Sequence, residues 1–106
     1  MAEAPVRAQV SPVAGVSTLL WTAGAYTVVS TLRACNTGRT VDYIRVRKVL
    51  AGEAEADRQY LVYETPVPPG QSFAMTEGET LLGEDSIYVS SRNGSVAFNL
   101  SGVEFS

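Results

Sequence analysis

The sequence contains no histidine and only one cysteine, Cys35, among its 106 residues. The absence of histidine removes the usual general base and the commonest transition-metal ligand of proteins. Histidine-dependent catalytic triads and histidine-ligated zinc sites are therefore excluded, and we expect neither enzymatic activity nor a cofactor. A single cysteine forms no internal disulfide and no cysteine-rich metal site, so the chain must fold by burying apolar side chains.

Long hydrophobic runs and excess positive charge are also missing. No apolar run approaches the ~20 residues of a membrane-spanning helix, and the start MAEAPVRAQVSPVAG lacks the apolar segment of a signal peptide. The net charge is −3, whereas non-specific nucleic-acid binding requires a basic face. We therefore expect no direct nucleic-acid partner, no membrane, and a protein that stays in the cytoplasm or is assembled into something there.

Short β-prone segments separated by turn residues make up most of the chain. Their number and spacing, with no credible long helix, predict an all-β fold: a two-sheet antiparallel β-sandwich of seven or eight strands, forming one domain over residues 16–106. The segments expected as strands are Val16–Thr22, Tyr26–Cys35, Val41–Leu50, Gln59–Thr65, Gln71–Thr76, Asp85–Ser91 and Val96–Phe105.

The first fifteen residues are rich in Ala, Pro and Val, and Pro5 and Pro12 interrupt regular structure. We expect an extended N-terminal arm over residues 1–15, with a short strand over Val6–Val10. Such an arm either frays as a chain terminus or lies along a neighbouring subunit, and the sequence leaves both alternatives open.

The stretch Thr40–Gly70 contains the clearest strand pattern, because apolar Ile44 and Val46 alternate with Arg45 and Arg47. The turn residues Asn36–Arg39 predict an antiparallel hairpin between Tyr26–Cys35 and Val41–Leu50, and Arg92–Ser95 predict a second hairpin. The prolines of Pro66–Gly70 mark an edge or a corner between sheets. A phase slip near Gly102 predicts a β-bulge in the last strand.

Five residues on the predicted strands are candidates for contacting a partner: Arg45, Arg47, Tyr60, Tyr63 and Tyr88. The two arginines form a basic strip with Lys48, and the hairpin would bring Arg33 and Arg39 close to it. Such a strip contacts an acidic partner surface. The alternative is an ordinary solvated sheet face whose arginines pair with Glu64 and similar residues on adjacent strands.

The acidic loops offer weaker candidates. Glu77, Glu79, Glu84 and Asp85 supply oxygen ligands of the kind that Ca²⁺ prefers, but without the spacing of an EF-hand loop. Carboxylates also alternate over residues 53–57, with no pocket signal beside them. We interpret both groups as solvated turns, and we expect Cys35, which ends a strand and has no histidine partner, to be a buried inert thiol.

Five motifs follow one another in a fixed order along the chain: Cys35-Asn36-Thr37, Ile44–Arg47, Pro66–Gly70, Leu82–Val89 and Gly102–Phe105. Their order and spacing resemble a group of small tailed-phage virion proteins. In that group a C/A-N-T turn precedes a V-x-V-x-V strand, a P-V-P-P-G corner, an L-x-x-G-D-S-I-x-V strand and a closing G-V-E motif. The resemblance covers most of the chain but not the N-terminal arm, and Glu84 stands where many relatives carry a small residue.

The resemblance implies a jelly-roll-like β-sandwich, commonly a homotrimer, and it carries over no catalytic residues. It predicts a structural protein of a bacteriophage-like virion, a capsid decoration or cement protein at the capsid surface, assembled in the host bacterial cytoplasm. Its partners would be the phage major capsid protein or other virion proteins. The alternative is a head-fibre, tail-fibre or neck component that binds a receptor or a glycan, which a concave patch around Tyr60, Tyr63 and Tyr88 would favour.

Overall fold

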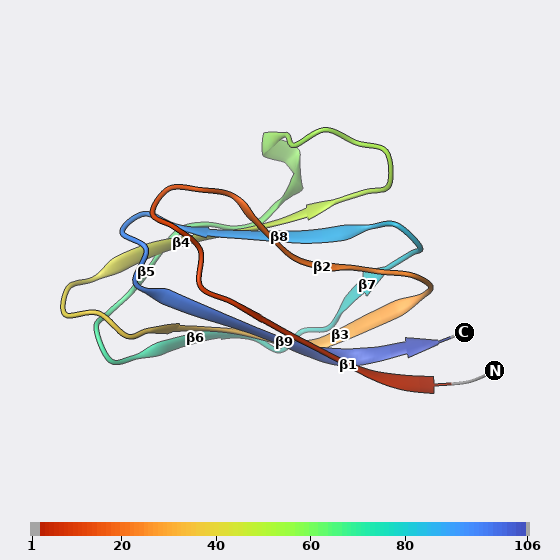
Figure 1. The fold of residues 1–106 in the computed structure, drawn as a ribbon, viewed down its shortest axis with the longest axis horizontal. Coiled ribbons are helices and arrows are strands. Elements are labelled where there is room, and N and C mark those ends of the chain that lie inside the picture. Colours follow the sequence, from red (N-terminus) through yellow and green to blue (C-terminus); the bar gives the residue numbers. More distant parts are fainter. Residues whose placement is uncertain (1–2, 106) are drawn as a thin grey trace.

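A computed structural model describes residues 3–105, which form two packed layers of β-strands (Figure 1). The longest and shortest dimensions are 45 and 20 Å, and the two described chain ends lie at the same end of the long axis. The strands are β1 (Glu3–Val10), β2 (Thr18–Thr22), β3 (Thr27–Asn36), β4 (Asp42–Val49), β5 (Tyr60–Val67), β6 (Ser72–Met75), β7 (Glu79–Leu81), β8 (Ser86–Ser91) and β9 (Val96–Phe105), and a 3₁₀ helix η1 spans Asp57–Gln59.

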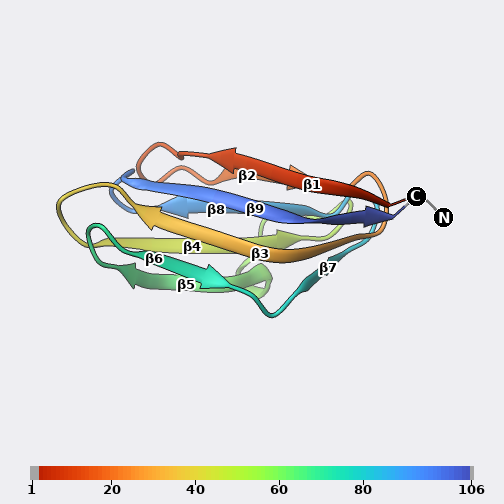
Figure 2. The same ribbon diagram turned by 90° about the horizontal axis from the view of Figure 1, so that it is seen from below.

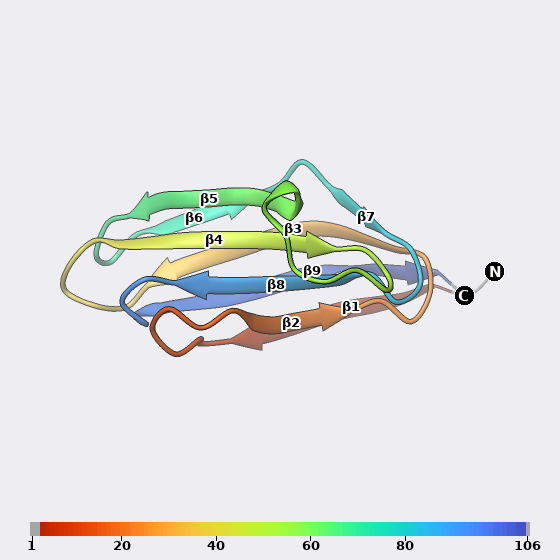
Figure 3. The same cartoon turned by 90° about the horizontal axis from the view of Figure 1, so that it is seen from above.

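The strand order identifies the topology. One sheet has the order β1-β9-β3-β6, with β7 also pairing with β3, and the other has the order β2-β8-β4-β5. Figures 2 and 3 show these two sheets from opposite sides. Apart from β7, each layer contributes four strands, and the orders β1-β9-β3-β6 and β2-β8-β4-β5 are the arrangement of a jelly roll. The predicted all-β sandwich is confirmed, and residues 3–105 form nine strands because Glu79–Leu81, expected as part of a turn, pairs with β3.

Alternating side chains of both sheets form a single apolar core. Ile44 and Val46 are fully buried, as their alternation with Arg45 and Arg47 predicts. The same alternation buries every second residue of β8 and of the first half of β9. The largest fully buried apolar side chains are Phe98, Ile44, Leu81, Ile87, Val46, Val67, Val89 and Val96.

Both predicted hairpins are wrong, because each turn carries the chain from one sheet to the other. Strand β3 already pairs with β9 along one edge and with β6 and β7 along the other, so it has no free edge for β4. Strand β8 is likewise flanked by β2 and β4 and has no free edge for β9. Among the described strands, only β4 and β5 are consecutive and paired. The prolines after β5 do mark a corner, since the chain passes there from one sheet to the other.

The end of the sandwich opposite the chain termini is held by two buried polar side chains. Asn36 is fully buried, and its amide nitrogen donates to the carbonyl oxygens of Thr40 and Val67, both at 2.8 Å. Its amide oxygen accepts hydrogen bonds from the N–H of Gly38 and the hydroxyl of Ser95. One side chain thereby ties the end of β5 to the β3–β4 and β8–β9 connections.

Asp42, also fully buried, completes this end. Its carboxylate accepts hydrogen bonds from the N–H groups of Tyr43, Asn93 and Ser95 and from the Ser95 hydroxyl, at 2.8–3.1 Å. Burial by itself would raise the pKa of Asp42, but the hydrogen bonds from Asn93, Ser95 and Tyr43 outweigh it and lower the pKa. The ionised carboxylate therefore fixes how β4 meets the β8–β9 connection.

The predicted separate arm over residues 1–15 is wrong for its described part. Glu3–Val10 pairs antiparallel with β9 along its whole length and forms an edge strand of the sandwich. Val6 is buried in the common core, and the strand that was expected over Val6–Val10 begins at Glu3. An unpaired β9 edge would otherwise expose its backbone polar groups, so β1 belongs to the domain.

The predicted bulge near Gly102 lies on the neighbouring strand. Val29 pairs with Gly102 and Thr31 with Ser101, so Ser30 of β3 is the extra residue. The two strands approach closely here, because a Cβ at Gly102 would lie 2.2 Å from the carbonyl oxygen of Val28. Only glycine fits this position without a shift of the backbone.

Candidate functional site

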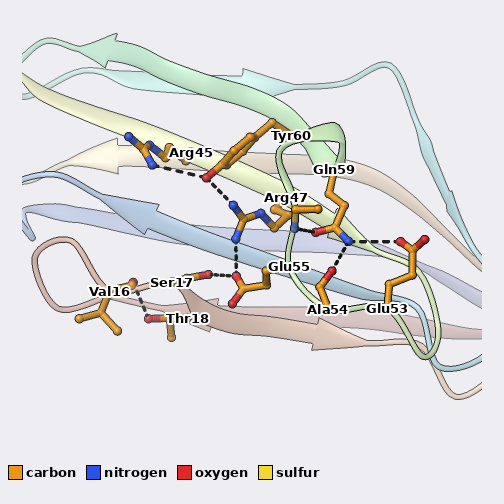
Figure 4. A network of polar contacts seen from close by, with 11 residues as sticks. Val16, Ser17, Thr18, Arg45, Arg47, Glu53, Ala54, Glu55, Gln59 and Tyr60 are labelled. Carbon is orange, nitrogen blue, oxygen red and sulfur yellow. Dashed lines mark hydrogen bonds and ion pairs between the residues drawn. The ribbon is translucent and has the colours of Figure 1, made fainter.

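All five predicted contact residues gather on one surface, the outer side of β2-β8-β4-β5. We call this surface the arginine–tyrosine face and define it by Tyr43, Arg45, Arg47, Tyr60, Tyr63, Glu64, Tyr88 and Arg92. Arg45 and Arg47 come from β4, Tyr60 from β5 and Tyr88 from β8, and Figure 4 shows Arg45, Arg47 and Tyr60 pointing toward one another. Tyr63 lies beside them, 59 % exposed.

Arg45 is neutralised by an acid on the adjacent strand. Two residues of β5, Tyr63 and Glu64, stand opposite the single Arg45, and Glu64 takes the left-handed φ of 52° at this bulge. Its carboxylate lies 2.9 Å from Arg45 Nε and 2.6 Å from Nη2 of Arg92. Hydrogen bonds from Arg45 and then from Arg92 lower the pKa of Glu64. The expected pairing of this face with Glu64 is confirmed.

The aromatic rings support the same guanidinium groups. Cζ of Arg45 lies 4.6 Å from the ring centroid of Tyr63, and Cζ of Arg92 lies 4.0 Å from that of Tyr43. Tyr60 and Tyr63 meet edge to face at 4.8 Å. Cation–π contacts of this kind stabilise exposed sites by about 0.5–1 kcal/mol each, so the tyrosines hold the arginines in place.

Arg47 is neutralised by the β4–β5 connection, which folds over the sheet (Figures 1 and 4). Its Nη1 lies 2.5 Å from a carboxylate oxygen of Glu55, and its Nη2 donates to the hydroxyl of Tyr60 at 2.5 Å. Ser17 donates to the same Glu55 oxygen. These hydrogen bonds, from Ser17 first and then from Arg47, lower the pKa of Glu55 against the opposing effect of burial. The buried Gln59 braces the connection by bonding to Ala56 N–H and the Ala54 carbonyl.

A small hollow of about 240 Å³ lies between the β1–β2 connection and the arginines, lined by Ser17, Arg45, Arg47, Tyr60, Tyr88 and Ser90 among others. An adjoining hollow of about 180 Å³ continues past Arg45 toward Arg92. Within the described residues, Nε of Arg47 is buried and has no hydrogen-bond partner. The hydroxyl, guanidinium and tyrosyl groups of this hollow could bind a small polar ligand.

Two members of the predicted basic strip lie elsewhere. Lys48 reaches across to the other sheet, where its ammonium pairs with Glu79 at 2.9 Å and donates to the Thr80 carbonyl. Arg33 lies on β3, whose outer side faces away from Arg45 on the opposite surface of the sandwich. The two placements have different reasons. Lys48 occupies the same inward-facing side of β4 as Ile44 and Val46 and pairs with the buried Ile87, whereas Arg33 is distant because β3 and β4 belong to different sheets.

The opposite surface has a composition that sequence reasoning missed. We call it the open face and define it by Arg7, Gln9, Thr31, Arg33, Asn99 and Ser101 on the outer side of β1-β9-β3. These residues line a broad depression of about 1000 Å³. Cys35, on the same side of β3 in register with Ala97, is half-buried instead of fully buried as expected. This face could have been predicted only if the segment around Arg7 had been assigned to a strand of the sandwich instead of to an arm.

The acidic loops do not form a metal centre in the described part of the chain, since residues 3–105 place no three Cys, Asp or Glu side chains together for an ion. Asp85 has a structural role: its carboxylate accepts hydrogen bonds from the N–H groups of Ala51 and Leu82, both at 2.9 Å. The carboxylate of Glu104 likewise accepts hydrogen bonds from the N–H groups of Gly24 and Ala25. These two carboxylates hold together the connections at the end of the sandwich where the termini lie.

No protein-family model matches the chain, and no curated protein matches it either. Within residues 3–105, no helix is long and apolar enough to span a membrane.

Proposed function

We propose that this protein is a structural component of a bacteriophage-like virion, a capsid decoration protein that binds the major capsid protein at the outer surface of the head. The observation that carries the proposal is the jelly-roll strand order, an architecture used repeatedly by viral capsid domains. The same architecture also serves lectins and enzymes, so the ordered motifs that resemble small tailed-phage virion proteins supply the specific part of the proposal.

The rigidity of the domain fits such a role. Carboxylates and an amide tie the connections at both ends of the sandwich, through the buried Asn36 and Asp42 at one end and the buried Asp85 and half-buried Glu104 at the other. A protein that stabilises a shell from outside binds best when little conformational entropy is lost on docking. A homotrimer would add several such contacts as avidity.

The test is to isolate particles from the producing bacterium with and without an intact gene. We expect the protein to co-purify with intact heads in stoichiometric amounts and heads lacking it to lose their DNA at lower temperature. Sedimentation equilibrium of the purified protein would measure whether it is a trimer. Particles that contain none of the protein would overturn the proposal.

A second candidate function is a receptor- or glycan-binding module on a head or tail fibre. The hollow beside Tyr60 and Tyr88 favours it, because aromatic and guanidinium groups there surround a volume suited to one sugar ring. Glycan-array binding that is lost in Tyr88→Ala, together with slower adsorption to host cells, would select this function. Binding to intact heads without glycan binding would select decoration.

A further inference from the structure

The basic side chains divide into two classes according to their partners. Of the eight lysines and arginines in the chain, five form ion pairs: Arg45, Arg47, Lys48, Arg58 and Arg92. Arg7, Arg33 and Arg39 pair with no carboxylate of residues 3–105. Two of these three, Arg7 and Arg33, are exposed and line the same depression. Unpaired positive charge is therefore concentrated on the open face of an otherwise acidic protein.

The sheet register sets the spacing of these two arginines. Arg7 lies in a row with Ser101 and Thr31, and Arg33 lies in the next outward-facing row with Asn99 and Gln9. The two rows are two residues apart along β9, and β9 separates the two strands. Given strand spacings of about 4.8 Å and a rise of about 3.4 Å per residue, the two Cα atoms lie about 12 Å apart. Two guanidinium groups thus flank a strip of short polar side chains.

The chemistry of the strip suits a flat contact. The amide of Gln9 donates to the side-chain oxygen of Asn99 at 2.6 Å, and the hydroxyl of Ser30 donates to the Ser101 carbonyl at 3.1 Å. Short side chains lose little rotamer entropy when covered. The residues that line the depression include no acid and no aromatic ring, so nothing on this face repels a carboxylate and nothing stacks on a base or a sugar.

We infer that the open face is a docking surface for an acidic protein surface, which on the proposed function belongs to the shell of the particle. A guanidinium group binds a carboxylate through two parallel hydrogen bonds, and both unpaired arginines are free to do so. A depression of about 1000 Å³ is four times the volume of the hollow on the arginine–tyrosine face and is open to solvent. Its breadth fits a protein surface better than a small ligand.

The opposite face is less suited to this role because its charge is already satisfied. Docking an acidic surface on Arg45 or Arg47 would bring carboxylates close to Glu64 and Glu55, and these like charges would repel one another. The residues that line the depression on the open face include no acid, so a docked carboxylate meets no like charge among them. The inference depends on the proposed function only for the identity of the partner, and not for its charge.

The test compares two double variants that change the net charge equally. Arg7→Glu/Arg33→Glu reverses both charges of the open face. Arg39→Glu/Arg58→Glu reverses two exposed arginines outside the depression and serves as the matched control. Circular dichroism and thermal unfolding would verify that both variants fold. We expect the first variant to occupy purified particles at least about tenfold less than wild type, with the control close to wild type.

Three outcomes of the particle experiment would overturn the inference. Equal occupancy by wild type and Arg7→Glu/Arg33→Glu would leave the proposed function standing and exclude this face. Equal losses in the two double variants would indicate a general charge effect. A change in oligomeric state confined to the Arg7→Glu/Arg33→Glu variant would make the open face a contact between copies of this chain.

A second measurement tests the face without particles. Immobilised poly-L-glutamate is a carboxylate surface, and at low salt we expect wild type and the control to bind it and Arg7→Glu/Arg33→Glu to bind at least about tenfold more weakly. Equal binding by all three proteins, or no binding, would overturn the inference. Tighter arginine-dependent binding to heparin than to poly-L-glutamate would also overturn it in favour of an anionic polysaccharide. If wild type binds poly-L-glutamate through these arginines but is absent from particles, only the proposed function fails.

Discussion

Both outer faces of the sandwich carry arginines, but those of one face are paired with carboxylates and those of the other are not. On the arginine–tyrosine face, Arg45, Arg47 and Arg92 each contact a carboxylate and a tyrosine ring. On the open face, Arg7 and Arg33 lie among serine, threonine, glutamine and asparagine and pair with no carboxylate of the described chain. Arginine content alone therefore does not identify a binding surface.

The difference shows that an arginine is available to bind another protein only when no carboxylate of its own chain already pairs with it. Glu64 accepts two guanidinium groups at once, so the face around it contributes to the stability of the fold and has little charge left to offer. The open face contributes few such contacts and keeps its charge available. Stability and binding are thus assigned to different sheets, and variants can separate the two.

The largest expected effect comes from the buried framework that both faces share. In Asp42→Ala, the N–H groups of Tyr43, Asn93 and Ser95 lose their acceptor in three part-buried hydrogen bonds, and an unsatisfied donor costs about 1–3 kcal/mol where it is buried. We expect the free energy of unfolding, measured by urea denaturation, to fall by about 3 kcal/mol or more. Asp57→Ala, at an exposed position, should change it by less than about 0.5 kcal/mol. Equal effects of the two substitutions would refute the role of Asp42.

The next effect is confined to the sheet of the open face. In Gly102→Ala, the new methyl group would meet the Val28 carbonyl oxygen at 2.2 Å, so β9 and β3 must separate. We expect a loss of about 2 kcal/mol or more, measured by thermal unfolding. Gly83→Ala is the matched control, because its methyl group would make ordinary contact with the Gly24 carbonyl oxygen at 3.6 Å. A neutral Gly102→Ala would mean that the close approach is not needed for the fold.

A smaller effect tests the stabilising role of the arginine–tyrosine face. The hydroxyl of Tyr60 accepts hydrogen bonds from both Arg45 and Arg47, so Tyr60→Phe should destabilise the protein by about 1 kcal/mol. Tyr63→Phe removes a hydroxyl from a residue that is 59 % exposed, and the free energy of unfolding should stay within about 0.5 kcal/mol of wild type. Indistinguishable values for the two variants would argue against the hydroxyl contact.

The smallest expected effect is a change in the pH dependence of stability. Arg45 and Arg92 lower the pKa of Glu64 below its ordinary value of 4.5. A carboxyl with a lowered pKa contributes its full stability above pH 4.5 and loses it as the pH falls through the folded-state pKa. Glu64→Gln should therefore flatten the decline in stability below pH 4.5 and cost about 0.5 kcal/mol at pH 7. Arg33→Gln, whose side chain pairs with no described carboxylate, should leave that decline unchanged; a flattened decline in this variant would contradict the comparison.

Much of the fold was predictable from strand periodicity. The alternation of Ile44 and Val46 with arginines, and the proline corner at Pro66–Gly70, were read correctly because both depend on local geometry. The two hairpins were not, since a turn such as Asn36–Arg39 has the same composition whether it joins neighbouring strands or opposite sheets. Which of these occurs depends on whether β3 has an edge free for β4. It has none, because β6, β7 and β9, from far along the sequence, pair with both edges of β3.

The same limit applied to the candidate site. Arg45, Arg47 and Tyr60 were each named as candidates, but their mutual contact was not predicted; it follows from the pairing of β4 with β5, the one consecutive pair of described strands that are neighbours in a sheet. Arg33 was misplaced with its hairpin, and Arg7 was assigned to an arm because Pro5 argued against a strand interior. Pro5 fits on β1 because that strand is at the edge of the sheet, where a residue without N–H is tolerated.

Imaging of particles that carry the protein would test the central claim most directly, because a reconstruction reveals which face of the sandwich meets the shell. We predict density for the protein on the outer surface of the head, with Arg7 and Arg33 against carboxylates of the shell and the arginine–tyrosine face turned to solvent. A reconstruction in which Arg45 and Tyr60 meet the shell while the open face is exposed would contradict the account.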